Sequence, residues 1–434
     1  MVKYRYYWNE YYGGNLNVDN SVKGAWLIYQ VAKLDKVTET SAFDNTVIAG
    51  KCGVLLSAIT QDNQAVVDNS RLDALAKAAG IKKIEIQEIL RKLKDQGLID
   101  IGKSGVDILG VTSKSCLQHT ANIFDSLNPT SLEDAAIELC EEASMQPKTV
   151  KAMSEMLSDK YRIAHDDTKM LFDLSLECGF VEREIIDGEK DLLFNGNLFK
   201  RDNIRKINAV LTSLSHGEAG KLTEMNQYLD NNACVPIQEA KKILGEDLFN
   251  KLSSVGIFDI SIVSNSKEEV AYITKPAAFS KYSMVDDAFD LAKMFVSSLT
   301  YGMTRSTYQR GQIRMIEALM TNLINGMPVG PVNAIGEDYK VLELKNVIQV
   351  YNGSKNGRNG YIMKLLKREV GVLALEVIKN ADVSSHSLTE LPSAAINRFK
   401  GPEVNRSILR KKEVGMHPKA TNDIIMSLRT GGIY

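Results

Sequence analysis

Residues 70–111 read SRLDALAKAAGIKKIEIQEILRKLKDQGLIDIGKSGVDILGV, and this stretch contains the pattern that predicts the fold. Ser70 is placed to cap a first helix, which Gly80 ends because glycine readily adopts the left-handed conformation found past helix ends. A second helix is expected over 83–96, where apolar residues recur at three- and four-residue spacing, and Gly97 ends it. The stretch therefore begins as two helices joined by a tight turn.

Two short strands follow these helices. Residues 98–101 and 106–111 are rich in isoleucine, leucine and valine, and the polar turn 102–105 separates them. The same order recurs twice further along the chain. The later copies have helices at 150–157 and 166–178 with a turn at Asp187-Gly188, and helices at 237–245 and 246–255 with a turn at 264–268. The sequence thus predicts three helix–turn–helix segments, each followed by a β-hairpin.

The three copies share one register. Each second helix ends in glycine, two apolar residues and an acid, in the stretches Gly97-Leu98-Ile99-Asp100, Gly179-Phe180-Val181-Glu182 and Gly256-Ile257-Phe258-Asp259. The glycines are 82 and 77 residues apart, a distance that suits one small domain per copy. This pattern resembles the winged helix-turn-helix superfamily over about half of the chain, with no single family matched.

The resemblance implies a fold class that is mainly α with small β-wings. We expect an aromatic arm and helix over 1–50 and three tandem winged helices over 51–125, 126–200 and 201–282. A mixed, mostly helical, basic domain with a tail is expected over 283–434. In most members of the superfamily the second helix and the wing contact double-stranded DNA, whereas other members bind proteins, so the fold alone does not decide the function.

The amino-acid composition bears on where the protein is located. The five cysteines include no CxxC pair, and neither a signal peptide nor an apolar run of about 18 residues is apparent, which favours a soluble, cytoplasmic protein.

The net charge of −1 conceals an asymmetry. Residues 280–434 contain 21 Lys and Arg against 14 Asp and Glu, whereas residues 1–279 contain 32 against 40. A basic part beside an acidic part indicates nucleic acid as a partner, or a basic face that docks on the acidic part.

Charge also separates the three predicted second helices, because DNA contact requires cations that face phosphates. In the first copy we expect DNA contacts from helix and wing side chains, namely Lys82, Lys83, Gln87, Arg91, Lys94 and Lys103. In the second copy the helix begins with Asp166-Asp167, and in the third with Glu246-Asp247. These acidic helices suit contacts with a protein partner or self-association better than contacts with DNA.

The C-terminal region is predicted to be helical over 285–325, with breaks near Gly302 and Gly311. Strands are expected over 339–351, a glycine-rich loop over 353–360 and a helix over 361–380. The loop and the tail supply the remaining candidate DNA contacts, which are Lys355, Arg358, Arg398, Lys400, Arg406, Arg410, Lys411 and Lys412. A solvated tail or an oligomer arm, and for the loop a plain surface hairpin, are the alternatives.

Two further segments have ambiguous signals. The N-terminal tyrosines and Trp8 lie among Lys3 and Arg5, a composition that fits either base stacking or a buried arm. Residues 338–345 read DYKVLELK, and an Asp followed by Glu-x-Lys on a strand is typical of Mg²⁺-dependent nucleases. The five-residue gap between Asp338 and Glu343 is too short for the usual hairpin, however, and a strand with exposed Glu and Lys explains the fragment as well. The pair Cys116 and His119 has metal-ligand spacing but no second pair nearby.

The sequence therefore predicts a non-enzymatic DNA-binding protein, a transcriptional or replication-type regulator, without cofactor or metal. A protein-interaction scaffold that uses the acidic second and third copies is the alternative, and a metal-dependent nuclease is a minor one.

Overall fold

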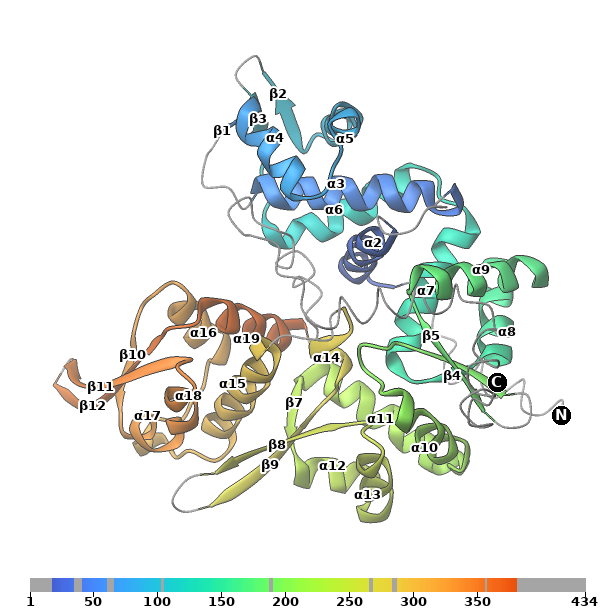
Figure 1. Ribbon diagram of the computed structural model, residues 1–434. Helices are drawn as coiled ribbons and strands as arrows, with labels where there is room; N and C mark the ends of the chain where they lie inside the picture. The colour runs from blue at the N-terminus through green and yellow to red at the C-terminus, as the bar shows by residue number, and fades with distance from the viewer. Residues whose placement is uncertain are drawn as a thin grey trace, which may run out of the picture. The chain divides into compact units, whose positions relative to one another are not determined.

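The computed structural model describes residues 18–34, 41–60, 66–102, 105–186, 190–264, 268–282, 287–355 and 357–380. These residues form mostly α-helices, together with four three-stranded antiparallel sheets (Figure 1). The predicted class, mainly helical with small sheets, is confirmed.

One arrangement recurs four times in the described residues. A short strand is followed by two helices and a β-hairpin, and the first strand pairs with the last, so the strand order is first, third, second. We call this arrangement a βααββ unit. A helix precedes each unit: α3 (Asp44–Thr60), α7 (Ser131–Met145), α11 (His216–Asn232) and α16 (Ile316–Ile324).

Units 1 and 2 lie where the sequence predicts the first two copies. Unit 1 consists of β1 (Val66–Asp68), α4 (Asn69–Ala78), α5 (Lys83–Asp95), β2 (Ile99–Ile101) and β3 (Gly105–Ile108). Unit 2 consists of β4 (Lys148–Thr149), α8 (Val150–Tyr161), α9 (His165–Cys178), β5 (Glu182–Ile186) and β6 (Lys190–Phe194). The cap of α4 differs from the prediction. The Asp68 side chain, rather than that of Ser70, accepts from the Arg71 backbone N–H at 2.9 Å.

Units 3 and 4 complete the series. Unit 3 consists of β7 (Cys234–Pro236), α12 (Ile237–Leu244), α13 (Glu246–Ser254), β8 (Asp259–Ser264) and β9 (Glu269–Thr274). Unit 4 consists of β10 (Val329–Val332), α17 (Asn333–Asp338), α18 (Lys340–Leu344), β11 (Ile348–Lys355) and β12 (Arg358–Leu365).

Unit 4 corrects the prediction for the C-terminal region. Residues 340–344 are helical rather than extended, the expected glycine-rich loop is the tip of a hairpin, and the expected helix over 361–380 begins only at Arg368. Gly302 lies inside helix α15 (Asp287–Thr304), and the chain leaves the helix just after it, before the 3₁₀ turn η2 (Tyr308–Arg310). Helix α19 (Arg368–Asn380) follows the unit and packs on α15 and α16.

The same turn ends the second helix of all four units. Gly97, Gly179 and Gly256 have positive φ angles of 67°, 74° and 78°, as the sequence pattern predicts, and Asn346 has 53°. In each unit the next backbone N–H donates to a carbonyl five residues earlier, as Val347 does to Leu342 at 2.9 Å in unit 4. This is the Schellman arrangement, which places the following strand against the helix. Asparagine tolerates the left-handed region better than other non-glycine residues, so it replaces glycine in unit 4.

Helix α2 (Asn20–Leu34) packs on α3 and α6 (Ser113–Ser126) through small residues. A Cβ added at Gly24 would lie 2.1 Å from the Leu117 carbonyl oxygen, and one at Gly53 would lie 2.4 Å from the Thr120 hydroxyl oxygen. Helix α3 packs on both α2 and α6, and most of its residues are buried. The α3 region, Ser41–Thr60, is also the one described helix with the length and apolar composition of a membrane span. Because 67% of that apolar window is buried, it matches the core helix of a soluble protein.

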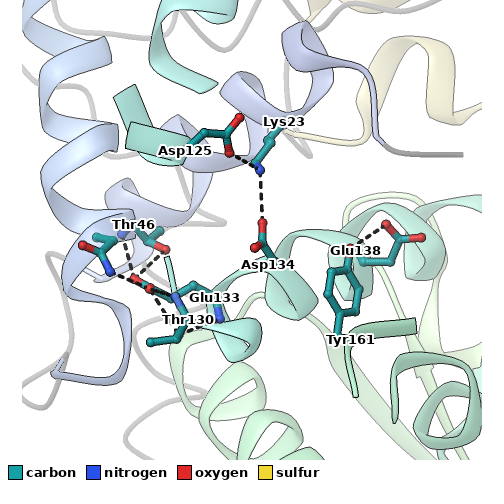
Figure 2. Close-up of polar contacts among 9 residues, drawn as sticks. Lys23, Thr46, Asp125, Thr130, Glu133, Asp134, Glu138 and Tyr161 are labelled. Atoms are coloured by element: carbon teal, nitrogen blue, oxygen red, sulfur yellow. Dashed lines mark hydrogen bonds and ion pairs between the residues drawn. The ribbon is translucent and has the colours of Figure 1, made fainter. Parts of the chain in front are cut away.

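A buried carboxylate joins the helices that precede units 1 and 2 (Figure 2). Glu133, which is 1% exposed, accepts from the Thr130 backbone N–H at the start of α7 and from the Thr46 backbone N–H at the start of α3, each at 3.0 Å. Nearby, the Lys23 ammonium bridges Asp125 on α6 and Asp134 on α7, at 2.6 Å and 3.0 Å. Glu133 thus caps α3 and α7, and Lys23 ties α2 to α6 and α7.

Candidate nucleic-acid interface

The predicted contacts on α5 lie on one exposed face. Ile86, Ile89, Leu90 and Leu93 face the core, which turns the opposite side of the helix to solvent. That exposed side carries the predicted residues Lys82, Lys83, Gln87, Arg91 and Lys94. With 3.6 residues per turn, Lys83, Gln87 and Lys94 form one row, and Arg91 lies beside it. The helix therefore presents a stripe of cations and an amide, flanked by the exposed carboxylates of Glu88 and Asp95.

Carboxylates reduce the charge of this stripe only in part. Lys83 lies 3.8 Å from Asp73, and Lys94 lies 3.0 Å from Asp100, but all four side chains are at least half exposed. Exposed ion pairs contribute at most about 1 kcal/mol, so a phosphate can displace them. Among the described residues, no carboxylate pairs with the Arg91 guanidinium.

Glu85, on the side of α5 away from the stripe, is neutralised internally. Its carboxylate accepts from the Lys51 ammonium at 2.8 Å and from the Lys82 backbone N–H at 2.9 Å. Partial burial by itself raises the pKa of Glu85, but these hydrogen bonds and the charges of both lysines outweigh it and hold the pKa below its usual value. Glu85 thus stays ionised with a cation beside it and adds little repulsion toward DNA.

The β11–β12 hairpin of unit 4 is a second basic surface. Between residues 344 and 368 the sequence contains no Asp or Glu and six cations, which are Lys345, Lys355, Arg358, Lys364, Lys367 and Arg368. Lys355 and Arg358 are exposed and directly opposite each other at the tip. No carboxylate in the described part of the chain pairs with either of them. The sequence analysis predicts these two residues but not Lys364 and Tyr351. The absence of Asp and Glu between residues 344 and 368 is the signal that marks this whole segment as basic.

The structure places Tyr351 and Lys364 on the solvent side of this hairpin. Side chains alternate between the two faces of a strand, and Val350 and Met363 face the core. Tyr351 is 40% exposed, and Lys364 is exposed on the neighbouring strand. The solvent side therefore combines one aromatic ring with several cations.

The second helices of units 2 and 3 present the opposite charge. On α9 the exposed side chains include Asp166, Asp167, Asp173 and Glu177 against one cation, Lys169. Helix α13 begins with exposed Glu246 and Asp247. The acidic side chains of α9 and α13 are therefore exposed, which is the condition for these helices to contact a protein partner.

The hairpins of units 2 and 3 also contact the helices that follow them. Glu184 on β5 lies 3.4 Å from Arg201 and 3.5 Å from Arg205 of α10 (Arg201–Thr212). Asp259 on β8 accepts from the Lys293 ammonium of α15 at 2.7 Å. Each of these hairpins is thus held against its own chain through charged side chains.

Several predicted contacts lie outside the described residues. These are Lys103 in the unit 1 hairpin and Arg398, Lys400, Arg406, Arg410, Lys411 and Lys412 in the tail. The aromatic N-terminal segment and the Asp187-Gly188 turn also lie outside them. Their roles remain predictions from the sequence.

The nuclease-like fragment does not form the strand that its interpretation requires. Residues 340–344 are helix α18, and Asp338 is buried in an ion pair with Arg310 at 2.9 Å. The Glu343 side chain is exposed. In the described part of the chain, no group of three or more His, Cys, Asp or Glu side chains is arranged to hold a metal. The carboxylates of this fragment therefore do not converge on a common ion site.

The cysteines are buried rather than poised for chemistry. Burial raises the pKa of Cys116 to about 11 and that of Cys52 to about 12, so both thiols stay protonated at neutral pH. The His119 ring is only partly buried, and this burial lowers the pKa of its imidazole.

No protein-family model fits the chain, and no curated protein sequence is significantly similar to it.

Proposed function

We propose that the βααββ units are winged helices and that the chain is a non-enzymatic protein that binds double-stranded DNA. One observation carries the proposal: α5 exposes Lys83, Gln87 and Arg91 on the helix that contacts DNA in most winged helices. Arginine and glutamine side chains read base edges in a major groove, and lysine neutralises phosphates. A transcriptional or replication-type regulator in the cytoplasm fits this activity.

Binding of the full chain to a labelled duplex tests the proposal. Replacing Lys82, Lys83 and Arg91 by alanine removes three cations from the exposed side of α5, so the affinity should fall and its salt dependence should flatten. The matched control replaces the exposed lysines Lys169, Lys206 and Lys221, which removes the same charge elsewhere. A wild-type chain without duplex affinity at low salt contradicts the proposal, and equal losses in both variants remove α5 from it.

A protein-interaction scaffold is the second candidate. The supporting observation is the acidic exposed face of α9, where Met170 is 45% exposed among carboxylates. An acidic helix with an exposed apolar side chain suits a basic protein surface better than a nucleic acid. Recovery of a stoichiometric protein partner by the wild type but not by Asp173→Lys, together with no DNA affinity, would favour this function.

A further inference from the structure

We propose that unit 4 makes a second contact with duplex DNA, through its hairpin rather than its second helix, and that this contact grips phosphates without reading sequence. The inference rests on the proposed function and adds a site and a mode of binding to it.

Helix α18 is poorly suited to read bases. It has only five residues, whereas α5 has thirteen. Its exposed side chains include Val341, which is 44% exposed, Leu344, which is 80% exposed, and the acidic Glu343. Apolar groups make no hydrogen bonds to base edges, and the carboxylate is repelled by the phosphates. Unit 4 therefore lacks a reading helix of the kind that unit 1 presents.

The hairpin tip projects beyond the sheet. Strand β10 pairs with β12 only as far as Tyr361, while β11 and β12 continue for three further pairs to Lys355 and Arg358. At about 3.3 Å per residue, the two-stranded tip extends about 10 Å past the third strand. A two-stranded ribbon of this kind is narrow enough to enter or straddle a DNA groove.

The base of the hairpin is firmly seated. A Cβ added at Gly336 on α17 would lie 2.5 Å from the Tyr361 ring, so this ring lies directly against the helix backbone. Met363 and Leu365 are buried in the core at 1% and 8% exposure. The tip is thus carried on packed residues, which lowers the entropy that DNA binding would have to remove.

The groups on the tip match phosphates. Lys355 and Arg358 are cross-strand neighbours, and Lys364 lies on the same solvent side further down. Lysine acts on phosphate as a strongly hydrated point charge, and contacts of this type fix position without carrying sequence information. Because no Asp or Glu interrupts residues 344–368, nothing on the hairpin opposes a phosphate backbone.

The test measures binding of the full chain to two labelled duplexes of unrelated sequence, by fluorescence anisotropy between about 50 and 200 mM salt. The hairpin variant carries Lys355→Ala and Arg358→Ala, and the control carries Lys206→Ala and Lys221→Ala. Losing two phosphate contacts should reduce the slope of log affinity against log salt by about 1.8 on both duplexes. The control should keep the wild-type slope.

The outcomes separate this inference from the proposed function. An unchanged slope in the hairpin variant, while the α5 variant loses affinity, overturns the second site and leaves DNA binding intact. A loss on one duplex only shows that the hairpin reads sequence, which overturns the proposed mode. No binding by the wild type to either duplex removes the proposed function and this inference together. Circular dichroism of the hairpin variant excludes loss of folding as the cause of an effect.

Discussion

The hairpins of units 3 and 4 share one strand arrangement and have opposite charge. In both, the third strand stops pairing three residue pairs before the tip, at Pro236–Tyr272 in unit 3 and at Val332–Tyr361 in unit 4. Residues 259–274 contain Asp259, Glu268, Glu269 and one cation, Lys267, for a net charge of −2. Residues 348–365 contain three cations and no acid, for a net charge of +3.

The two hairpins also differ in whether their charged side chains are paired with other parts of the chain. Two of the three carboxylates of the unit 3 hairpin accept from α15, since Glu268 accepts from the Tyr301 hydroxyl at 2.8 Å and Asp259 accepts from the Lys293 ammonium. The cations at the unit 4 tip have no such partner among the described residues. One arrangement of strands therefore serves as an internal brace in unit 3 and offers a free charged surface in unit 4, and side-chain charge decides between them.

The largest effect should come from reversing the charge of the unit 4 tip. Lys355→Glu with Arg358→Glu replaces two attractive contacts by two repulsive ones, so duplex affinity at low salt should fall roughly 100-fold. Electrophoretic mobility shift of the full chain measures it. Affinity within threefold of wild type would mean that the tip does not contact DNA and that the charge difference between the two hairpins has no effect on DNA binding.

Releasing the unit 3 hairpin should lower stability without creating a DNA site. Lys293→Ala removes the hydrogen bond to Asp259 and the ammonium 5.6 Å above the Phe279 ring, so the free energy of unfolding should fall by about 1–2 kcal/mol. Denaturant titration measures the change. Lys379→Ala, an exposed lysine on α19, is the control and should stay within about 0.5 kcal/mol of wild type. A similar loss in both variants would show that α15 does not brace the hairpin through Lys293.

The turn before each hairpin allows a finer comparison. Asn346→Val places a β-branched residue at a φ of 53°, which should cost about 1 kcal/mol, whereas Asn346→Gly should cost nothing or stabilise by a few tenths. Thermal unfolding of both variants, each against wild type, gives the difference. If valine is tolerated as well as glycine, the left-handed turn does not constrain unit 4 as it constrains the other units.

The smallest effect should follow from making the unit 3 tip more basic. Glu269 is exposed, and Glu269→Lys changes the hairpin charge from −2 to 0. Because Asp259 and Glu268 remain bonded to α15, we expect less than a twofold change in duplex affinity by anisotropy. A gain of tenfold would show that charge alone, without a free hairpin, creates the site.

The sequence predicts units 1 to 3 well because glycine marks the end of each second helix. Unit 4 is not predicted from the sequence, for two physical reasons. Asn346 occupies the left-handed position that glycine occupies elsewhere, and Gln349 replaces the acid of the repeated pattern. In addition, α17 and α18 have only six and five residues, too few to show helical periodicity, so residues 340–344 resemble a strand.

The candidate interface was predictable where helical periodicity sets the exposed face of α5, and at Lys355 and Arg358 beside the glycine-rich turn. The stripe on α5 follows from the positions of Ile86, Ile89 and Leu93, which fix the direction of the remaining side chains. Contacts between distant residues do not follow from periodicity. The Lys51–Glu85 pair joins residues 34 apart, and the bracing of Asp259 by Lys293 also joins residues 34 apart, so both required the structure.

The shared carboxylate of Glu133 has a consequence for how the chain melts. Because one oxygen caps α7 from within and the other caps the first turn of α3, helix α3 has no complete N-terminus without α7. A cap contributes about 1 kcal/mol, and here one side chain supplies it to two helices that belong to successive units. Units 1 and 2 should therefore unfold in a single cooperative transition, and a fragment cut between α6 and α7 would begin to fray at Thr46.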